Sequence, residues 1–213
     1  MKITIVGAGS TYTPELAEGL ILGAAKLDLH DLYLYDINEE RLRIVGGLVE
    51  RMVKATGDRF KVKLTLNRTE AISGADFVLT QIRVGGQEAR HLDTKICLEE
   101  GIIGQETTGP VGFAKAMRTI PVILDICSEI RTHAPGAFMI NFTNPAGIVT
   151  EAVLKYGGVK VIGLCNVPFG LQAAVAEEYG VPVQKVELDY VGLNHLAWVR
   201  RILVDGEDKT KDI

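Results

Sequence analysis

Short apolar runs alternate with longer amphipathic stretches along most of this chain, and that alternation constrains its fold more than any other feature. The runs, which are rich in β-branched residues, predict strands at residues 2–6, 31–35, 61–66, 76–82, 137–142 and 160–165. The stretches between them predict helices at 13–26, 39–56, 87–100, 115–133, 146–156 and 169–179. Continuously apolar strands are buried on both faces, so the sheet is mainly parallel and covered by helices. We therefore expect an α/β fold with a Rossmann-like, doubly wound parallel sheet.

The pattern changes after Gly180-Val181-Pro182, which marks a turn. Residues 186–193 and 196–204 read as two strands of a different, antiparallel element. Residues 205–213 read as a polar turn with no closing element. We expect a first domain over residues 1–185 and, over 186–213, the start of a second, α+β domain that is truncated.

Composition excludes several functions. The 213 residues are 47% hydrophobic, enough for one well-packed domain and the start of another. The net charge is −4 with scattered Lys and Arg, which gives no basic face for nucleic acid. We expect no membrane segment, because no apolar run reaches about 18 residues. Three cysteines without disulfide-like spacing, and a first strand in place of a signal peptide, favour a reducing cytoplasm.

A glycine turn follows the first predicted strand and opens the first helix, as a dinucleotide site requires. The turn, Gly7-Ala8-Gly9-Ser10, departs from G-x-G-x-x-G at Tyr12. Asp36 ends the second strand, where a carboxylate accepts hydrogen bonds from ribose and repels a 2′-phosphate, so NAD is favoured over NADP. The alternative role for Asp36 is the N-cap of the next helix. The predicted cofactor contacts are Gly7, Gly9, Ser10, Thr11 and Asp36.

Cys165 and His195 are the candidate metal ligands. Cys165 ends an apolar run, and His195 closes Gly192-Leu193-Asn194-His195. A thiolate and an imidazole suit a divalent transition metal. A metal beside a nicotinamide cofactor indicates redox chemistry at a carbonyl or hydroxyl group. The alternative is a small buried thiol and a core histidine.

Three polar motifs follow the ends of the fourth, fifth and sixth strands, where ligands bind in such sheets. They span residues 82–86, 141–147 and 165–168. Asn144 is either an N-cap, with Pro145 at the first helical position, or an amide fixed beside the cofactor. Arg83 and Arg90 either form surface ion pairs or clamp an anion or hydroxyl.

Together these motifs resemble glycoside hydrolase family 4, in particular its 6-phospho-β-glucosidases. The resemblance covers essentially the whole chain. It is carried by the motifs at residues 7–15, 81–86, 104–107, 113–121, 143–145, 165–168 and 192–195. It implies a fold like that of lactate and malate dehydrogenases, with NAD and Mn²⁺, or another divalent metal, as cofactors. It also implies a phosphorylated disaccharide or β-glucoside as substrate and, at full length, a homo-oligomer.

The resemblance implies an uncommon route to hydrolysis. The sugar is oxidised at C3 by NAD⁺, the leaving group at C1 is eliminated after proton loss from C2, water adds, and the hydride returns. By position, Cys165 and His195 resemble the metal ligands, and Arg90 and Asn144 resemble substrate contacts. Glu106 resembles the acid that increases the basicity of a catalytic tyrosine. That tyrosine and the phosphate-binding residues are expected beyond Ile213.

Asn166 stands where α-specific relatives carry an acidic proton donor. An amide donates a proton poorly, which favours the β-specific branch. Two other functions remain open at this point. One is an NAD-dependent hydroxy-acid dehydrogenase, and the other, for this chain alone, is a non-catalytic NAD-binding module.

Overall fold

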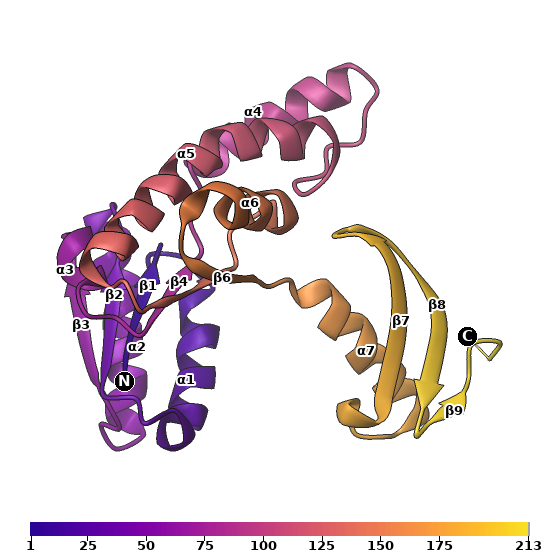
Figure 1. Ribbon diagram of the computed structural model, residues 1–213, viewed down its shortest axis with the longest axis horizontal. Coiled ribbons are helices and arrows are strands. Elements are labelled where there is room, and N and C mark those ends of the chain that lie inside the picture. The colour runs from indigo at the N-terminus through magenta and orange to yellow at the C-terminus, as the bar shows by residue number, and fades with distance from the viewer. Residues whose placement is uncertain (213) are drawn as a thin grey trace.

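The computed structural model describes residues 1–212 and contains the predicted parallel sheet (Figure 1). Six strands lie in the order β3-β2-β1-β4-β5-β6, and every neighbouring pair is parallel. The order reverses between β1 and β4, the position where doubly wound sheets bind ligands. The strands are β1 (Lys2–Val6), β2 (Asp31–Tyr35), β3 (Lys61–Thr65), β4 (Phe77–Thr80), β5 (Phe138–Asn141) and β6 (Lys160–Gly163).

Helices cover both faces of this sheet, so the α/β prediction is confirmed. Ile3 and Ile5 of β1 pack in a core with α1 and α2, while Val6 joins the opposite core with α3, α5 and α6. The alternation along β1 thus feeds two separate apolar layers. The helices of this unit are α1 (Thr13–Leu27), α2 (Glu39–Ala55), α3 (Arg68–Ile72), α4 (Gly86–Glu99), α5 (Gly109–His133) and α6 (Ala146–Ala152), followed by the π-helix η1 (Val153–Gly157).

Two helices of this unit differ most from the sequence expectation. α3 was not expected; it spans only five residues, too few to show a helical period, and begins where the Asn67 side chain accepts a hydrogen bond from the Glu70 N–H. α5 begins at Gly109 instead of residue 115, because Pro110 fits the first turn of a helix. The extra turns place Lys115 inside the helix and on its buried side.

The second unit holds α7 (Asn166–Tyr179), the short 3₁₀ helix η2 (Val183–Lys185) and an antiparallel sheet of β7 (Val186–Leu193), β8 (Leu196–Val204) and β9 (Glu207–Asp208). β9 corrects the expectation that no element follows residue 204. It pairs with β8 through a turn at Asp205-Gly206, whose φ values of 51° and 81° are those a tight hairpin turn requires.

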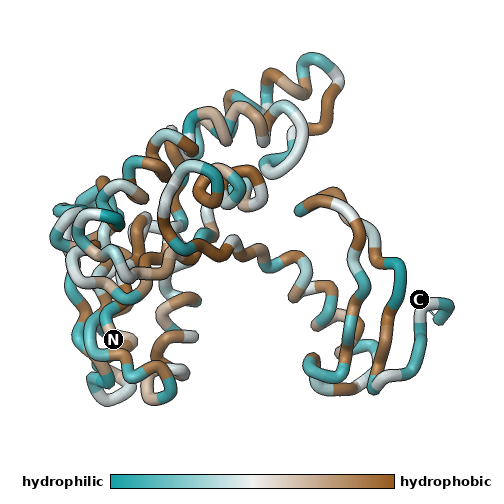
Figure 2. Tube along the Cα trace, in the orientation of Figure 1, coloured by the Kyte–Doolittle hydropathy of each residue, from teal (hydrophilic) through white to brown (hydrophobic). Residues whose placement is uncertain are grey.

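α7 shares its core with this antiparallel sheet. Val175 and Ala176 of α7 pack with Val186 of β7 and Val204 of β8. The expected division at residue 185 therefore separates elements that pack together. Apolar residues continue from β6 into the link with α7 (Figure 2), and Leu164 in that link is 47% exposed. Within residues 1–212, no helix combines the length and apolarity needed to cross a membrane.

Candidate functional site

The glycine turn after β1 is built so that backbone can approach closely. Gly7 has φ 95°, and a Cβ there would lie 2.8 Å from the carbonyl oxygen of Gln81. A Cβ at Gly9 would lie 2.9 Å from Asp36 Oδ2. Side chains are therefore excluded at both positions, as at the two leading glycines of a dinucleotide-binding turn.

Thr11 supplies the free donor of this turn. The N–H groups of Gly7 and Ala8 both donate to the Tyr35 carbonyl, and those from Gly9 to Thr13 also have acceptors, with the exception of Thr11. Thr11 is exposed and precedes Tyr12, the N-cap of α1. A helix N-terminus with an unused N–H attracts an anion, so this position fits the pyrophosphate of a dinucleotide.

Asp36 faces the same turn from the end of β2. Its Oδ2 accepts a hydrogen bond from the Gly9 N–H at 2.8 Å, and its Oδ1 accepts one from the Asn38 N–H at 2.9 Å. Asn38, not Asp36, caps α2 by accepting from the Arg41 N–H. The carboxylate keeps further lone pairs for ribose hydroxyls, since each oxygen can accept more than one bond.

Cys165 and His195 come together across 30 residues of sequence. Cys165 Sγ lies 3.3 Å from His195 Nε2, between the end of β6 and the β7–β8 turn. One cation can bridge this distance, because metal–sulfur and metal–nitrogen bonds are about 2.3 and 2.1 Å long. Among residues 1–212, no three His, Cys, Asp or Glu side chains converge on one point. A cation held by these two side chains would have further coordination positions open for a substrate.

The β7–β8 hairpin is shaped to present His195. His195 has φ 62°, a left-handed conformation that few side chains adopt, and Gly192 has φ 125° where a Cβ would collide with the Leu196 carbonyl. The tip of the hairpin also reaches α6, because Asn194 Cβ lies 3.6 Å from the place of a Cβ on Gly147. A backbone strained at one residue is typical of a functional position.

A second cluster forms around Glu106, in the segment that joins α4 to α5. Arg83 Nη1 lies 2.5 Å from Glu106 Oε1, and Lys115 pairs with the same oxygen. Arg90 Nη2 lies 3.9 Å from Oε2. The Lys115 side chain is only 5% exposed and that of Glu106 17%. Three cations around one carboxylate leave the cluster with a surplus of positive charge at the carboxyl side of the sheet.

The pKa values of Glu106 and Lys115 are both lowered, but for opposite reasons. Burial raises the pKa of Glu106, but the hydrogen bonds and charges of Lys115 and Arg83 outweigh burial and leave that pKa below its ordinary value. Burial lowers the pKa of Lys115, Arg83 and Arg90 lower it further, and Glu106 compensates only in part. At neutral pH Glu106 is thus anionic. The charged form of Lys115 is stabilised by the Glu106 carboxylate.

Two predicted site residues, Asn144 and Asn166, lie at the starts of helices. Asn144 precedes α6 through a cis peptide bond to Pro145, and its Oδ1 accepts a hydrogen bond from the Ala146 N–H at 3.3 Å. Pro145 thus stands before the helix, not at its first position. Asn166 is the first residue of α7, next to Cys165. Among residues 1–212, no hydrogen bond or ion pair joins the Glu106 cluster to Cys165 or His195.

Sequence analysis did not single out three residues that contact the site residues: Lys115, which pairs with Glu106, and Gln81 and Thr13, whose side chains hydrogen-bond to carbonyls of the glycine turn. Lys115 carried a signal, since Val111 and Thr119 lie one helical turn on either side and both are buried. A charge on the buried stripe of a helix needs a partner, which the structure identifies as Glu106. Gln81 and Thr13 had no comparable signal, because each is an ordinary polar residue beside a turn.

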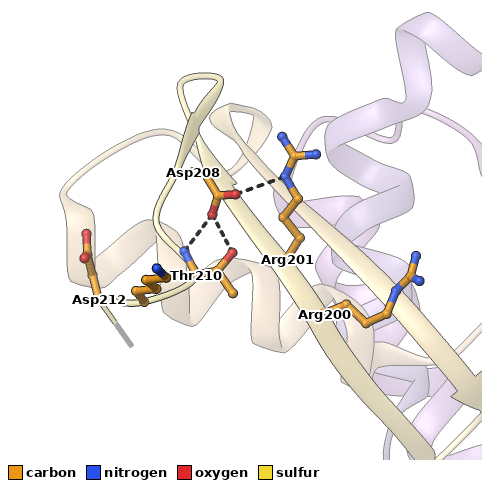
Figure 3. Close-up of a pocket in the computed structure, with 6 residues that line it drawn as sticks. Arg200, Arg201, Asp208, Thr210 and Asp212 are labelled. Atoms are coloured by element: carbon orange, nitrogen blue, oxygen red, sulfur yellow. Dashed lines mark hydrogen bonds and ion pairs between the residues drawn. The ribbon is translucent and has the colours of Figure 1, made fainter.

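A separate hollow of about 530 Å³ lies on the second unit (Figure 3). Its two arginines already have carboxylate partners. Arg200 lies 2.7 Å from Asp189, and Arg201 lies 3.3 Å from Asp208. Asp208 also accepts from Thr210. The hollow contains none of the predicted site residues, and we assign it no ligand.

The fold and the glycine turn are those of dinucleotide-binding proteins, and a cysteine–histidine pair lies between the end of β6 and the β7–β8 turn. The chain belongs to glycoside hydrolase family 4: the model of the family 4 glycosyl hydrolases matches residues 2–181. The resemblance drawn from the motifs is thereby confirmed. The chain is 49% identical to a probable 6-phospho-β-glucosidase of Bacillus subtilis over 97% of its length and 47% of that protein. It is 41% identical to the 6-phospho-β-glucosidase of Escherichia coli over 100% of this chain and 48% of that protein.

Solved structures of family members resemble this chain as well. The 6-phospho-β-glucosidase of Thermotoga maritima, determined with manganese, NAD⁺ and glucose-6-phosphate, is 41% identical and superimposes with a TM-score of 0.94 over 100% of this chain and 52% of its own. Malate dehydrogenase of Salinibacter ruber, 15% identical with a TM-score of 0.71, shares the fold alone. This chain spans about half the length of the curated relatives it matches.

Proposed function

We propose that the protein of which this chain forms part hydrolyses 6-phospho-β-glucosides with NAD and a divalent metal. The reaction would proceed by oxidation at C3, elimination across C1–C2, addition of water and re-reduction. The observation that carries the proposal is the Cys165–His195 pair, with 3.3 Å between its donor atoms, in a chain whose glycine turn is shaped for a dinucleotide. An ordinary glycosidase, which uses two carboxylates, needs neither feature.

The preference for β-glucosides is supported by Asn166 and by the relatives. Asn166 follows Cys165 directly, and its amide cannot serve as an efficient proton donor to a leaving group. The two relatives named above are 6-phospho-β-glucosidases at 49% and 41% identity, whereas a 6-phospho-α-glucosidase of Lacticaseibacillus paracasei is 37% identical.

The residues of this chain would hold the substrate and its charges in place. When bound, NAD supplies a hydride acceptor, and a divalent cation supplies Lewis-acid polarisation of the sugar oxygens. Thr11 N–H would bind the pyrophosphate, and Asp36 the adenosine ribose. Arg83, Arg90 and Asn144 would orient the sugar, and Cys165 and His195 would hold the cation. Glu106, kept anionic by Lys115 and Arg83, would increase the basicity of a tyrosine outside this chain.

A hydroxy-acid dehydrogenase is the competing function. The likeness to malate dehydrogenase, at 15% identity, concerns the fold alone and does not support that activity. The Cys165–His195 pair argues against it, because hydride transfer from a hydroxy acid to NAD⁺ needs no cysteine–histidine metal site. For this chain in isolation, a non-catalytic NAD-binding module remains the alternative.

Two further proposals concern the whole protein. We infer that it works in the cytoplasm, which the three free cysteines support. We also infer that it is a homo-oligomer at full length. Sedimentation analysis of the full-length protein tests the second inference, and a monomer at micromolar concentration would contradict it.

Exchange of the C2 proton tests the proposed chemistry. The full-length protein is incubated with a 6-phospho-β-glucoside in D₂O, with and without NAD⁺ and Mn²⁺, and the product sugar is examined by NMR. Deuterium at C2, together with a requirement for both cofactors, is expected. Hydrolysis without exchange and without cofactors would assign the protein to two-carboxylate chemistry instead.

A further inference from the structure

A chain of hydrogen bonds connects the end of β4 to the glycine turn. Gln81 Nε2 donates to Thr13 Oγ1 at 2.7 Å and to the Gly7 carbonyl at 3.3 Å. Thr13 Oγ1 in turn donates to the Ala8 carbonyl at 2.9 Å. Two side chains 68 residues apart in sequence thus hold two successive carbonyls of the turn.

These bonds lie where they control the turn. The Thr13 side chain is completely buried, so its hydroxyl cannot exchange its partners for water. Gln81 itself is fixed, because its backbone N–H donates to the Val6 carbonyl at 3.0 Å. Peptide groups are planar, so fixing the Gly7 and Ala8 carbonyls also fixes the N–H groups of Ala8 and Gly9. The first two peptide planes of the turn that leads to Thr11 are thereby held.

We propose that Gln81 and Thr13 are positioning residues for the pyrophosphate of the dinucleotide, acting through the carbonyls of Gly7 and Ala8. This inference rests on the proposed function, and it adds the residues that hold the turn in its binding conformation. Neither side chain need touch the cofactor. Their effect is to hold the turn that carries the Thr11 N–H, its one donor without an acceptor among residues 1–212, at the N-terminal end of α1.

The adenosine half of the cofactor provides an internal control. Its expected partner is Asp36, which accepts one hydrogen bond from the Gly9 N–H in the turn and a second from the Asn38 N–H outside it, so its position depends only in part on the turn that Gln81 and Thr13 hold. A loss confined to the pyrophosphate therefore weakens NAD⁺ binding and leaves adenosine binding unchanged. A general loss of structure weakens both ligands equally, so the comparison separates positioning from folding.

Calorimetric titration of the 213-residue chain with NAD⁺ and with adenosine tests the inference. Gln81→Met, which removes both donated bonds at nearly constant volume, should weaken NAD⁺ binding about tenfold, the effect of losing one or two hydrogen bonds. Thr13→Val should act similarly, and Thr13→Ser, which keeps the hydroxyl, should stay within about twofold of wild type. Gln87→Met on the exposed face of α4 is the matched control.

The outcomes are distinct. Selective loss of NAD⁺ binding in Gln81→Met and Thr13→Val, with Thr13→Ser close to wild type, supports the inference. Unchanged NAD⁺ binding in Gln81→Met, or equal losses for NAD⁺ and adenosine, overturns it alone. A wild-type chain that binds no NAD⁺ overturns the proposed function and this inference with it.

Discussion

The Glu106 cluster predicts that two substitutions of one ion pair have unequal effects on stability. Glu106 has two cationic partners at hydrogen-bond distance, Arg83 and Lys115. Lys115 has Glu106 alone as a hydrogen-bond partner within residues 1–212, and its side chain is 5% exposed. Removing the carboxylate therefore leaves a buried ammonium without a counter-ion. Removing the ammonium leaves the carboxylate still paired with Arg83.

The magnitudes follow from that difference. Removing one partner of a buried pair costs about 3–5 kcal/mol. A glutamine at 106 still offers an amide oxygen to Lys115, so we expect Glu106→Gln to cost about 2–3 kcal/mol. Lys115→Met fills a similar volume and removes a buried charge, so we expect a cost of about 1 kcal/mol or less. Urea unfolding followed by far-UV circular dichroism measures both values.

The pH dependence gives an independent check. In Glu106→Gln the pKa of Lys115 falls further below its ordinary value, since burial persists while the carboxylate is gone. The unfolded chain then binds more protons than the folded one, so stability rises with pH and the cost of the substitution shrinks towards pH 10. In wild type the pKa of Glu106 is lowered, so its contribution is present above about pH 4.3 and is lost as acid protonates the folded carboxyl.

Substitutions in an exposed pair serve as controls. Lys95 and Glu99 on α4 lie 3.8 Å apart, with side chains 59% and 62% exposed. Lys95→Met and Glu99→Gln should each change stability by less than about 0.5 kcal/mol. If Lys115→Met costs as much as Glu106→Gln, or if the cost of Glu106→Gln grows with pH, the reasoning from burial and partner number is refuted.

Three further outcomes are expected. Wild type should bind NAD⁺ more tightly than NADP⁺, and Asp36→Ala should narrow the difference; equal affinities in wild-type titrations would reject the ribose role of Asp36. Cys165→Ser should weaken Mn²⁺ binding and leave NAD⁺ affinity near wild type; unchanged Mn²⁺ affinity in the variant would make Cys165 a structural residue. The 213-residue chain alone should hydrolyse almost no substrate, since a missing general base lowers rates by about 10²–10⁴-fold; full activity without cofactors would contradict the mechanism.

The fold could be predicted from the sequence because most strands of the parallel sheet are short apolar runs between recognisable helices; β3, with Lys61 and Lys63, is the exception. The errors have local causes. β4 ends at Thr80, two residues before the predicted end, because Ile82 N–H donates to the Thr143 hydroxyl and leaves the ladder. β9 is two residues long, and its hairpin signal, Asp205-Gly206, lies within a polar segment that shows no strand pattern.

α7 shows a limit of a different kind. Its apolar residues fit packing against either the parallel sheet or the antiparallel sheet, and periodicity does not identify the partner of a helix. Only the contacts of Val175 and Ala176 with Val186 and Val204 place α7 in the second unit. The position of Cys165 depends on this, since it lies at the junction of the two units.

The candidate site also has features that a local motif predicts and features that depend on contacts between distant residues. Gly7, Gly9 and Asp36 could be identified because their chemistry is written in a short motif at a strand end. The motif alone does not tell which of its backbone N–H groups remains free for a ligand, because that depends on acceptors elsewhere in the chain. The Tyr35 carbonyl accepts from the N–H groups of Gly7 and Ala8, and Asp36 accepts from that of Gly9. Backbone donors in a tight turn are satisfied wherever an acceptor is in reach, so an unused one is informative. Among residues 1–212, the N–H of Thr11 is the one donor of this turn without an acceptor, which supports the proposal that Thr11, one of the predicted cofactor contacts, binds the pyrophosphate.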